Sequence, residues 1–152
     1  MKMDKTDKSI LNLLQKNART TNKELAQELG LSTTPIFERV KKLEKNGVIK
    51  NYVALVDNKK VDKKLIAFVS IELMRHNKGQ LMNFENSIAR LKEVMECFHI
   101  AGNTDYILKI AIADMEEYHK FLTDRLSAIE NIASIDSSFV LTEVKRETAF
   151  AV

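Results

Sequence analysis

The sequence has few of the residues that cross-link or interrupt a chain: one cysteine, one proline, four glycines and no tryptophan among 152 residues. A single Cys97 cannot form an internal disulfide, which fits a reducing cytosol. So little Gly and Pro excludes collagen-like and low-complexity chains. No apolar run approaches the roughly 20 residues of a membrane span, and residues 1–4 open no signal peptide. We therefore expect a cytoplasmic globular protein that does not contact membranes.

Charge is divided unevenly along the chain, although 24 Lys/Arg and 21 Asp/Glu leave a net charge of only +3. Residues 1–60 carry 13 basic and 7 acidic side chains, whereas residues 61–152 carry 11 and 14. A basic front half and an acidic back half indicate that only the front half meets a polyanion.

The front half has the pattern of a helix-turn-helix. Apolar residues at helical spacing predict a first helix over 7–16. Thr21 and Glu24 form a capping-box signature at the start of a second helix, and Gly30 lies where the chain must turn. Two helices joined by a short Gly-containing turn commonly place an α-helix in the DNA major groove.

The third helix is expected to start at an N-cap Ser32 and to run to about residues 46–47. Pro35 falls in its first turn, where the missing N–H breaks no helical hydrogen bond. Ile36, Val40 and Leu43 make its buried stripe, and residues 48–55 follow as a β-rich segment that would form a wing.

The outward face of this helix is basic, as expected for phosphate contacts and groove entry. A solvated helix face is the plain alternative, but the capping, turn and charge asymmetry together favour DNA contact. Glu38 either accepts a hydrogen bond from cytosine or pairs with Lys41 or Lys42, and the sequence does not choose between these. The predicted DNA-contacting residues are Ser32, Thr33, Thr34, Phe37, Glu38, Arg39, Lys41, Lys42 and Lys45.

The back half alternates strand and helix periodicities in the order β-α-β-β-α-β. Strands are expected at 65–73, 94–101, 105–113 and 135–144, and helices at 78–91 and from Asp114 onward, the last burying Met115, Tyr118, Leu122 and Leu126. This order predicts a ferredoxin-like antiparallel sheet backed by two helices. The other sheet face would carry Ile66 and Phe68, or their neighbours, with Ile107, Ala111 and Val140. This face would be too apolar for solvent, which predicts a partner subunit.

Several motifs together resemble the Lrp/AsnC group, the leucine-responsive or feast/famine transcriptional regulators, and most closely the leucine-responsive branch. The matching stretches lie within residues 7–19, 29–35 and 38–49 of the front half. Those of the back half are Glu96-Cys97, Gly102-x-x-Asp105-Tyr106-x-Leu108-Lys109, Asp114-Met115-x-x-Tyr118 and Glu143-Val144-Lys145. The resemblance spans residues 4–147, and the Gly-x-x-Asp-Tyr turn paired with this N-terminal motif is fairly specific.

The resemblance implies an α+β chain: a winged helix-turn-helix over 1–53, a linker with a connecting strand over 54–64, and a ferredoxin-like ligand-sensing domain over 65–152. It also implies dimers that gather into tetramers or octamers, and an amino-acid effector bound between dimers near the turn at 102–106. We expect no other cofactor. The expected effector-site residues are His99, Gly102, Asn103, Thr104, Asp105, Tyr106, Met115, Val140 and Leu141.

The turn chemistry is compatible with that role, because exposed backbone N–H groups can hold a carboxylate and Asp105 can accept from an ammonium group. Asp105 could equally be an Asx-type residue that only stabilises the turn. His99 stands where the leucine-responsive branch tends to carry an aliphatic residue, and Thr104 where a bulkier one is common. The resemblance therefore does not specify leucine as the effector.

No catalytic motif is present, so we expect no enzyme activity. Cys97 and His99 share a strand face, but two ligands without a third make a weak metal site, and we expect none. The sequence thus predicts an oligomeric regulator of transcription that binds double-stranded DNA. The alternative is an amino-acid-sensing module that acts through protein contacts alone. An RNA-binding sheet is disfavoured because the strand at 105–113 lacks the aromatic and basic pattern that such sheets use.

Overall fold

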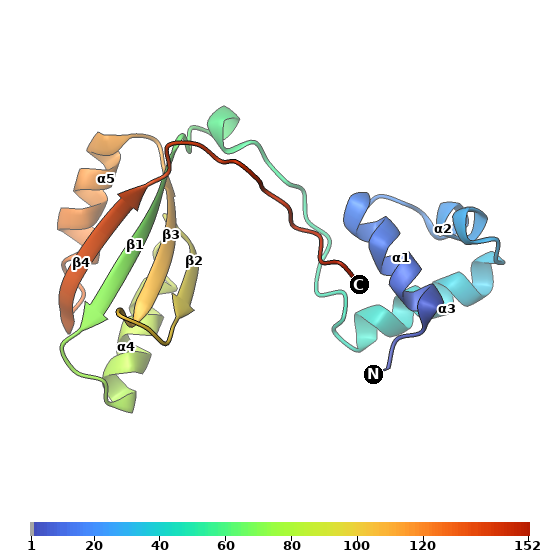
Figure 1. Ribbon diagram of the computed structural model, residues 1–152, viewed down its shortest axis with the longest axis horizontal. Helices are drawn as coiled ribbons and strands as arrows, with labels where there is room; N and C mark the ends of the chain where they lie inside the picture. The colour runs from blue at the N-terminus through green and yellow to red at the C-terminus, as the bar shows by residue number, and fades with distance from the viewer. Residues whose placement is uncertain (1) are drawn as a thin grey trace. The chain divides into compact units, whose positions relative to one another are not determined.

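The computed structural model describes residues 2–152 in two compact units, whose elements are labelled in Figure 1. The first unit contains the chain up to Leu55 together with Val144–Val152, and the second contains Val56–Glu143. The junction at 55–56 falls within the predicted linker. Residues 144–152, assigned from the sequence to the C-terminal domain, instead associate with the N-terminal unit.

Three helices build the first unit: α1 (Lys5–Lys16), α2 (Asn22–Leu29) and α3 (Thr33–Lys45). Each presents apolar side chains at helical spacing to one shared core, which includes the fully buried Ile10, Leu25, Ile36 and Leu43. Helix α1 begins earlier than predicted because Asp4 caps it. The Asp4 carboxylate accepts from the Asp7 N–H, and the Asp7 carboxylate accepts from the Asp4 N–H.

The prediction of a wing strand at 48–55 was wrong, because in the described part of the first unit this segment is not a strand. A strand needs a partner for its backbone hydrogen bonds, and this unit offers no other strand to supply one. The chain is fastened by side chains instead. The Tyr52 hydroxyl donates to Glu44 of α3 at 2.9 Å, and burial, followed by the neighbouring Glu44 carboxylate, raises the pKa of Tyr52 to about 12.

The last residues of the chain lie against α1. The side-chain amide of Gln15 donates to the carbonyl oxygen of Phe150 at 3.0 Å and accepts from the Phe150 N–H at 2.7 Å. Asn12, one turn earlier on the helix, donates to the main-chain oxygen of Val152 at 3.4 Å. Side-chain amides of α1 therefore satisfy main-chain hydrogen-bonding groups of residues 150–152.

The second unit is a four-stranded antiparallel sheet in the order β2-β3-β1-β4, confirming the ferredoxin-like topology. Figure 1 shows β1 between β3 and β4. The strands are β1 (Leu65–Leu73), β2 (Val94–His99), β3 (Tyr106–Ile112) and β4 (Ile132–Phe139). The helices are α4 (Lys78–Ile88) and α5 (Met115–Phe121), the latter continued by a π-helical turn at Leu122–Leu126, and a short 3₁₀ turn at Asn58–Val61 precedes the sheet.

Both helices pack on one face of the sheet. Alternate residues of β1 and β3 point to that face and are buried against Phe84 and Ile88 of α4 and Tyr118 and Phe121 of α5. The other face has no covering helix. It presents the side chains of Ile66, Phe68, Ile107, Ala111 and Phe98, as their register requires.

Some element ends differ from the sequence prediction. Helix α4 stops at Ile88 rather than at residue 91. Strand β4 covers 132–139 rather than 135–144, and its pairing with β1 ends where the Val140 N–H donates to the Ile66 carbonyl. Asp114 caps α5 as expected, but Met115 is 54% exposed instead of buried. Across residues 2–152, no helix combines the length and apolarity needed to cross a membrane.

Candidate DNA interface and effector site

The start of α2 and the turn that follows it are held by local hydrogen bonds that the sequence predicts. The Thr21 N–H donates to the Glu24 carboxylate at 2.6 Å, and the Glu24 N–H donates to the Thr21 hydroxyl at 3.2 Å. Gly30 has a φ of +63° and ends α2, and the next N–H, that of Leu31, returns to the Ala26 carbonyl at 2.9 Å. The chain then enters α3, with Ser32 in the N-cap position but with no hydrogen bond from its side chain to the helix.

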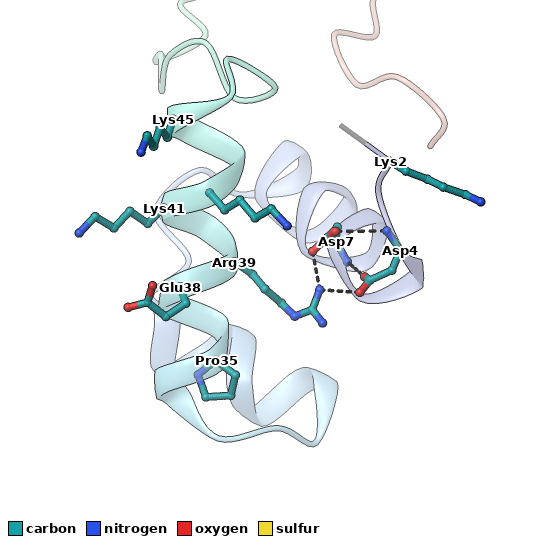
Figure 2. Close-up of a pocket in the computed structure, with 9 residues that line it drawn as sticks. Lys2, Asp4, Asp7, Pro35, Glu38, Arg39, Lys41 and Lys45 are labelled. Atoms are coloured by element: carbon teal, nitrogen blue, oxygen red, sulfur yellow. Dashed lines mark hydrogen bonds and ion pairs between the residues drawn. The ribbon is translucent and has the colours of Figure 1, made fainter.

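Helix α3 has one buried and one exposed face. Ile36, Val40 and Leu43 are buried in the core, as predicted. Eight of the nine predicted DNA-contacting residues are exposed: Ser32, Thr33, Thr34, Phe37, Glu38, Lys41, Lys42 and Lys45. Figure 2 shows Glu38, Lys41 and Lys45 on the same side of the helix. This row can meet an anionic surface without any rearrangement of the core.

Neighbouring side chains on this face are arranged in two ways that the sequence left open. The Lys41 ammonium lies 5.7 Å from the centre of the Phe37 ring, a cation–π contact that limits the freedom of both residues. Glu38 forms no ion pair with Lys41 or Lys42 within 4.0 Å in the described part of the chain. Its carboxylate is thus free to accept a hydrogen bond from outside the protein.

The ninth residue, Arg39, points elsewhere. Its Nη1 donates to Asp4 at 2.7 Å and to Asp7 at 2.6 Å, so the guanidinium spans from α3 to the start of α1 (Figure 2). Hydrogen bonds to these carboxylates raise the pKa of Arg39. The hydrogen bond from the Asp7 N–H, followed by that from Arg39, lowers the pKa of Asp4. Periodicity placed Arg39 on the flank of α3 but did not identify these partners.

The predicted effector turn, Gly102–Tyr106, joins β2 to β3 and is cross-linked by Asp105. The Asp105 carboxylate accepts from the Leu73 N–H at 2.7 Å and lies 2.9 Å from the His76 Nε2. The Leu73 N–H is the main cause that lowers the pKa of Asp105, and His76 adds to it. Asp105 therefore ties the turn to the end of β1, rather than closing an Asx turn within its own segment.

Tyr106 and His99 stand side by side at this end of the sheet. Tyr106 is buried, donates its hydroxyl proton to Glu85 at 2.8 Å and packs on Phe84. The His99 ring stacks on Tyr106 with ring centres 4.5 Å apart. Burial, and then the Glu85 carboxylate, raises the pKa of Tyr106. Tyr106 thus supports the turn from the core, and His99 covers it from the edge strand.

Three other predicted effector residues lie at the opposite end of the same sheet. Met115 follows the end of β3, while Val140 and Leu141 follow the end of β4, which pairs with the start of β1. Six residue steps of about 3.4 Å separate Tyr106 from Ile112, so the two groups are about 20 Å apart along the strand. One copy of the chain does not bring all nine residues together.

Sequence reasoning missed the residues that hold the loop after β1. Asn131, which has a φ of +72°, accepts from the Arg75 N–H at 3.0 Å and donates to the Arg75 carbonyl at 2.8 Å. His76 contacts Asp105, as described above. No local signal joins such partners, since 29 to 56 residues separate them. Asp4 was detectable, because Asp4 and Asp7 have capping-box spacing.

The candidate metal pair gains no support from its surroundings. Cys97 is exposed on the edge strand β2 rather than buried in the core. Within residues 2–152, no group of three or more His, Cys, Asp or Glu side chains is arranged to hold a metal ion.

Comparison with known proteins matches both units. A family model described as winged helix-turn-helix DNA-binding matches residues 3–50, and one described as the Lrp/AsnC ligand binding domain matches residues 66–150. The leucine-responsive regulatory proteins of Escherichia coli K12 and Klebsiella pneumoniae are each 36% identical over 150 residues, covering 99% of this chain and 92% of theirs.

Solved structures agree with this match. A crystal structure of a Neisseria meningitidis transcriptional regulator in complex with L-Met superposes with a TM-score of 0.93 and 37% identity, over 98% of this chain and 96% of the other. An AsnC family transcriptional regulator from Agrobacterium tumefaciens gives a TM-score of 0.93 at 35% identity, over 97% and 96%.

Proposed function

Since this chain belongs to the Lrp/AsnC family, and is thus a DNA-binding transcription regulator modulated by an effector, we propose how its residues divide these tasks. Helix α3 enters the major groove. Its exposed row of Lys41, Lys42 and Lys45 contacts phosphates, and Ser32, Thr33, Thr34, Phe37 and Glu38 lie near base edges. The observation that carries this assignment is the exposed basic face on a helix whose opposite face is locked into the core.

A salt titration tests the phosphate role of the lysines. Replacing Lys41 and Lys45 together by Ala should make the negative slope of log affinity against log salt less steep by about 1.8, because each phosphate contact contributes about −0.9. The control is the pair Lys78→Ala and Lys92→Ala, which removes two exposed lysines from the second unit. An equal slope in wild type and the α3 variant would remove these lysines from the interface.

We propose that the effector is an amino acid held at the Gly102–Tyr106 turn. Backbone N–H groups of Gly102, Asn103 and Thr104 would bind its carboxylate. A carboxylate has about four lone-pair positions, so Asp105 keeps room for an ammonium group beside its bonds to Leu73 and His76. The complex of the Neisseria meningitidis regulator with L-Met supports this class of effector.

The effector site would be completed by a second copy of the chain. Met115, Val140 and Leu141 lie at the far end of the sheet, so they reach an effector at this turn only from another subunit. The uncovered sheet face with Phe68 and Phe98, 42% and 51% exposed, is the surface through which we propose that subunits pair. A two-fold dimer would set its α3 helices in successive major grooves, about 34 Å apart, in the cytosol of the cell.

Light scattering with and without each of the twenty amino acids tests the effector. We expect an apolar amino acid, methionine or leucine among them, to shift the mass distribution or the DNA affinity, and its D-enantiomer not to do so. Asp105→Asn should weaken the response, while Asp124→Asn, which removes an exposed carboxylate from the turn at Leu122–Leu126, should leave it unchanged. If no amino acid changes either property, the turn is structural and the amino-acid proposal fails.

A further inference from the structure

Arg39 joins two helices of the DNA-binding unit. It extends from α3 toward the first turn of α1, and both protons of Nη1 are used, one on Asp4 and one on Asp7 (Figure 2). The same two carboxylates also form the capping box of α1. The position of α1 is thereby coupled to that of α3 through a single side chain.

The Asp7 carboxylate is buried, so breaking its contact with Arg39 would be costly. The Asp7 side chain is only 8% exposed, whereas those of Arg39 and Asp4 are 33% and 53% exposed. A carboxylate removed from water needs an opposite charge and hydrogen bonds, and loss of the partner leaves it uncompensated. Arg39 supplies both, so the contact with Asp7 resists separation of the two helices.

The side chain of Arg39 points in a different direction from those of Lys41 and Lys45 on the same helix. Glu38, Lys41 and Lys45 lie on one side of α3, while Arg39 points across to Asp4 and Asp7 (Figure 2). The two carboxylates that hold the guanidinium carry more negative charge than its single positive charge. The guanidinium therefore adds no net positive charge to the local surface that meets DNA.

We infer that Arg39 is a positioning residue: it sets the orientation of α3 against α1 and acts on DNA through that helix, without contacting a phosphate. This inference rests on the proposed entry of α3 into the major groove. Base-edge hydrogen bonds depend on the placement of the helix more strictly than phosphate contacts do. Loss of the link should therefore reduce discrimination between sequences more than general affinity.

The Asp4→Asn substitution distinguishes a phosphate contact of Arg39 from a positioning role, because the two roles predict opposite effects on DNA binding. Asn is as good an N-cap as Asp, so α1 keeps its start, but Arg39 loses the charge of one of its two carboxylate partners and keeps only Asp7. If Arg39 bound phosphate, removal of this competing carboxylate would raise affinity for every DNA. If Arg39 is a positioning residue, loss of this contact should reduce discrimination about three- to tenfold, in the lower part of the range of coupling between neighbouring residues.

Discrimination is measured as the ratio of dissociation constants for a scrambled DNA and for a DNA selected by the wild-type protein from a random pool. Glu28→Gln, which removes an exposed carboxylate from α2, is the matched control and should leave the ratio unchanged. Arg39→Gln should lower the ratio without changing the salt slope, and adding Asp4→Asn to it should have no further effect. An unchanged discrimination ratio for Asp4→Asn would overturn the inference. So would a slope of log affinity against log salt that is less steep by about 0.9 for Arg39→Gln.

Failure of the proposed groove entry of α3 would be recognisable by itself, because replacing Lys41 and Lys45 by Ala would then leave the salt dependence of DNA binding unchanged. The link between the helices has an independent readout in thermal unfolding of the full chain. Asp4→Asn should lower the Tm in the wild-type background and leave it unchanged in the Arg39→Gln background. Equal effects in both backgrounds would show that the two residues are not coupled, against the inference.

Discussion

Asp105 cross-links two segments of the chain at the end of the sheet where β2 turns into β3. It joins the β2–β3 turn to the end of β1 through the Leu73 N–H and faces His76. The hydrogen bond from Leu73, and then His76, holds the pKa of Asp105 below its usual value of 3.8. The charged form is therefore favoured in the folded protein.

The pH dependence of stability follows from this direction. A carboxylate with a lowered folded-state pKa stabilises the fold above its unfolded pKa, and the contribution is lost as the pH falls through the folded value. Asp105→Asn should thus lower the urea midpoint of the second unit at pH 7, and the difference from wild type should shrink as the pH falls from about 5 to below 3.8. A difference between Asp105→Asn and wild type that is constant with pH would contradict the assignment.

Residues whose partners are close in sequence were predictable, and those with distant partners were not. Thr21 and Glu24 are three residues apart, so their mutual hydrogen bonds follow from a sequence pattern. Arg39 is 32 residues from Asp7, and Asp105 is 32 residues from Leu73. Only the packed fold brings such groups together, and helical periodicity reveals the direction of a side chain without its partner.

At the level of elements, the helix-turn-helix depends on a backbone conformation as well as on packing. Gly30 ends α2 in the left-handed region, with a φ of +63°, and no atom lies within 4 Å of the position that a Cβ would occupy. A side chain there meets open space. The cost of a substitution at this position is consequently one of backbone strain alone.

Gly30→Ala should destabilise the first unit by about 1 kcal/mol, because only the left-handed backbone penalty applies. Gly79→Ala is the matched control. Gly79 lies in the first turn of α4 without a positive φ, and its added Cβ would meet Asn77 Oδ1 at an ordinary 3.5 Å. This second change should be neutral or stabilising in denaturant unfolding. Equal effects of the two substitutions would show that the turn conformation is not the cause.

Strands, which need a neighbouring strand for their backbone hydrogen bonds, were predicted less well than helices, which do not. The helices of the first unit were predicted from periodicity and caps, since a helix satisfies its own backbone. The segment 48–55 is rich in β-forming residues, yet the part of the first unit that the structure describes has no strand to pair with it. Strand β4 likewise ends at Phe139, where its pairing with β1 ends, although the apolar pattern continues.

For the molecule as a whole, the sequence indicated two units of opposite charge and the order of strands in the second. It placed Ile107 and Ala111 on the uncovered sheet face, together with Ile66 and Phe68 or their neighbours. The register shows that Ile66 and Phe68 are the ones on this face. It could not show that Met115 and Leu141 lie far from the effector turn, because that separation follows from the direction of each strand in the sheet.

Assembly through the uncovered sheet face predicts a defined effect of one substitution. Phe68→Glu places a charge in the centre of this face, so it should dissociate the oligomer by the cost of burying an unpaired carboxylate. Size-exclusion chromatography with light scattering should show a smaller particle. Met82→Glu, at a 50% exposed methionine of α4, should leave the mass unchanged. Dissociation by Met82→Glu alone would assign the interface to the helical side instead.

The pairing of Gln15 with Phe150 has a consequence for how the protein can be divided. The unit that contains α1, α2 and α3 is discontinuous in sequence, since its last residues return to it after the whole sensing unit. A fragment cut after Leu55 would leave the amides of Asn12 and Gln15 without their main-chain partners. An affinity tag added beyond Val152 would likewise modify the DNA-binding unit rather than the sensing unit. Measurements of DNA affinity on such proteins would report an altered α1 surface as well as the effect intended.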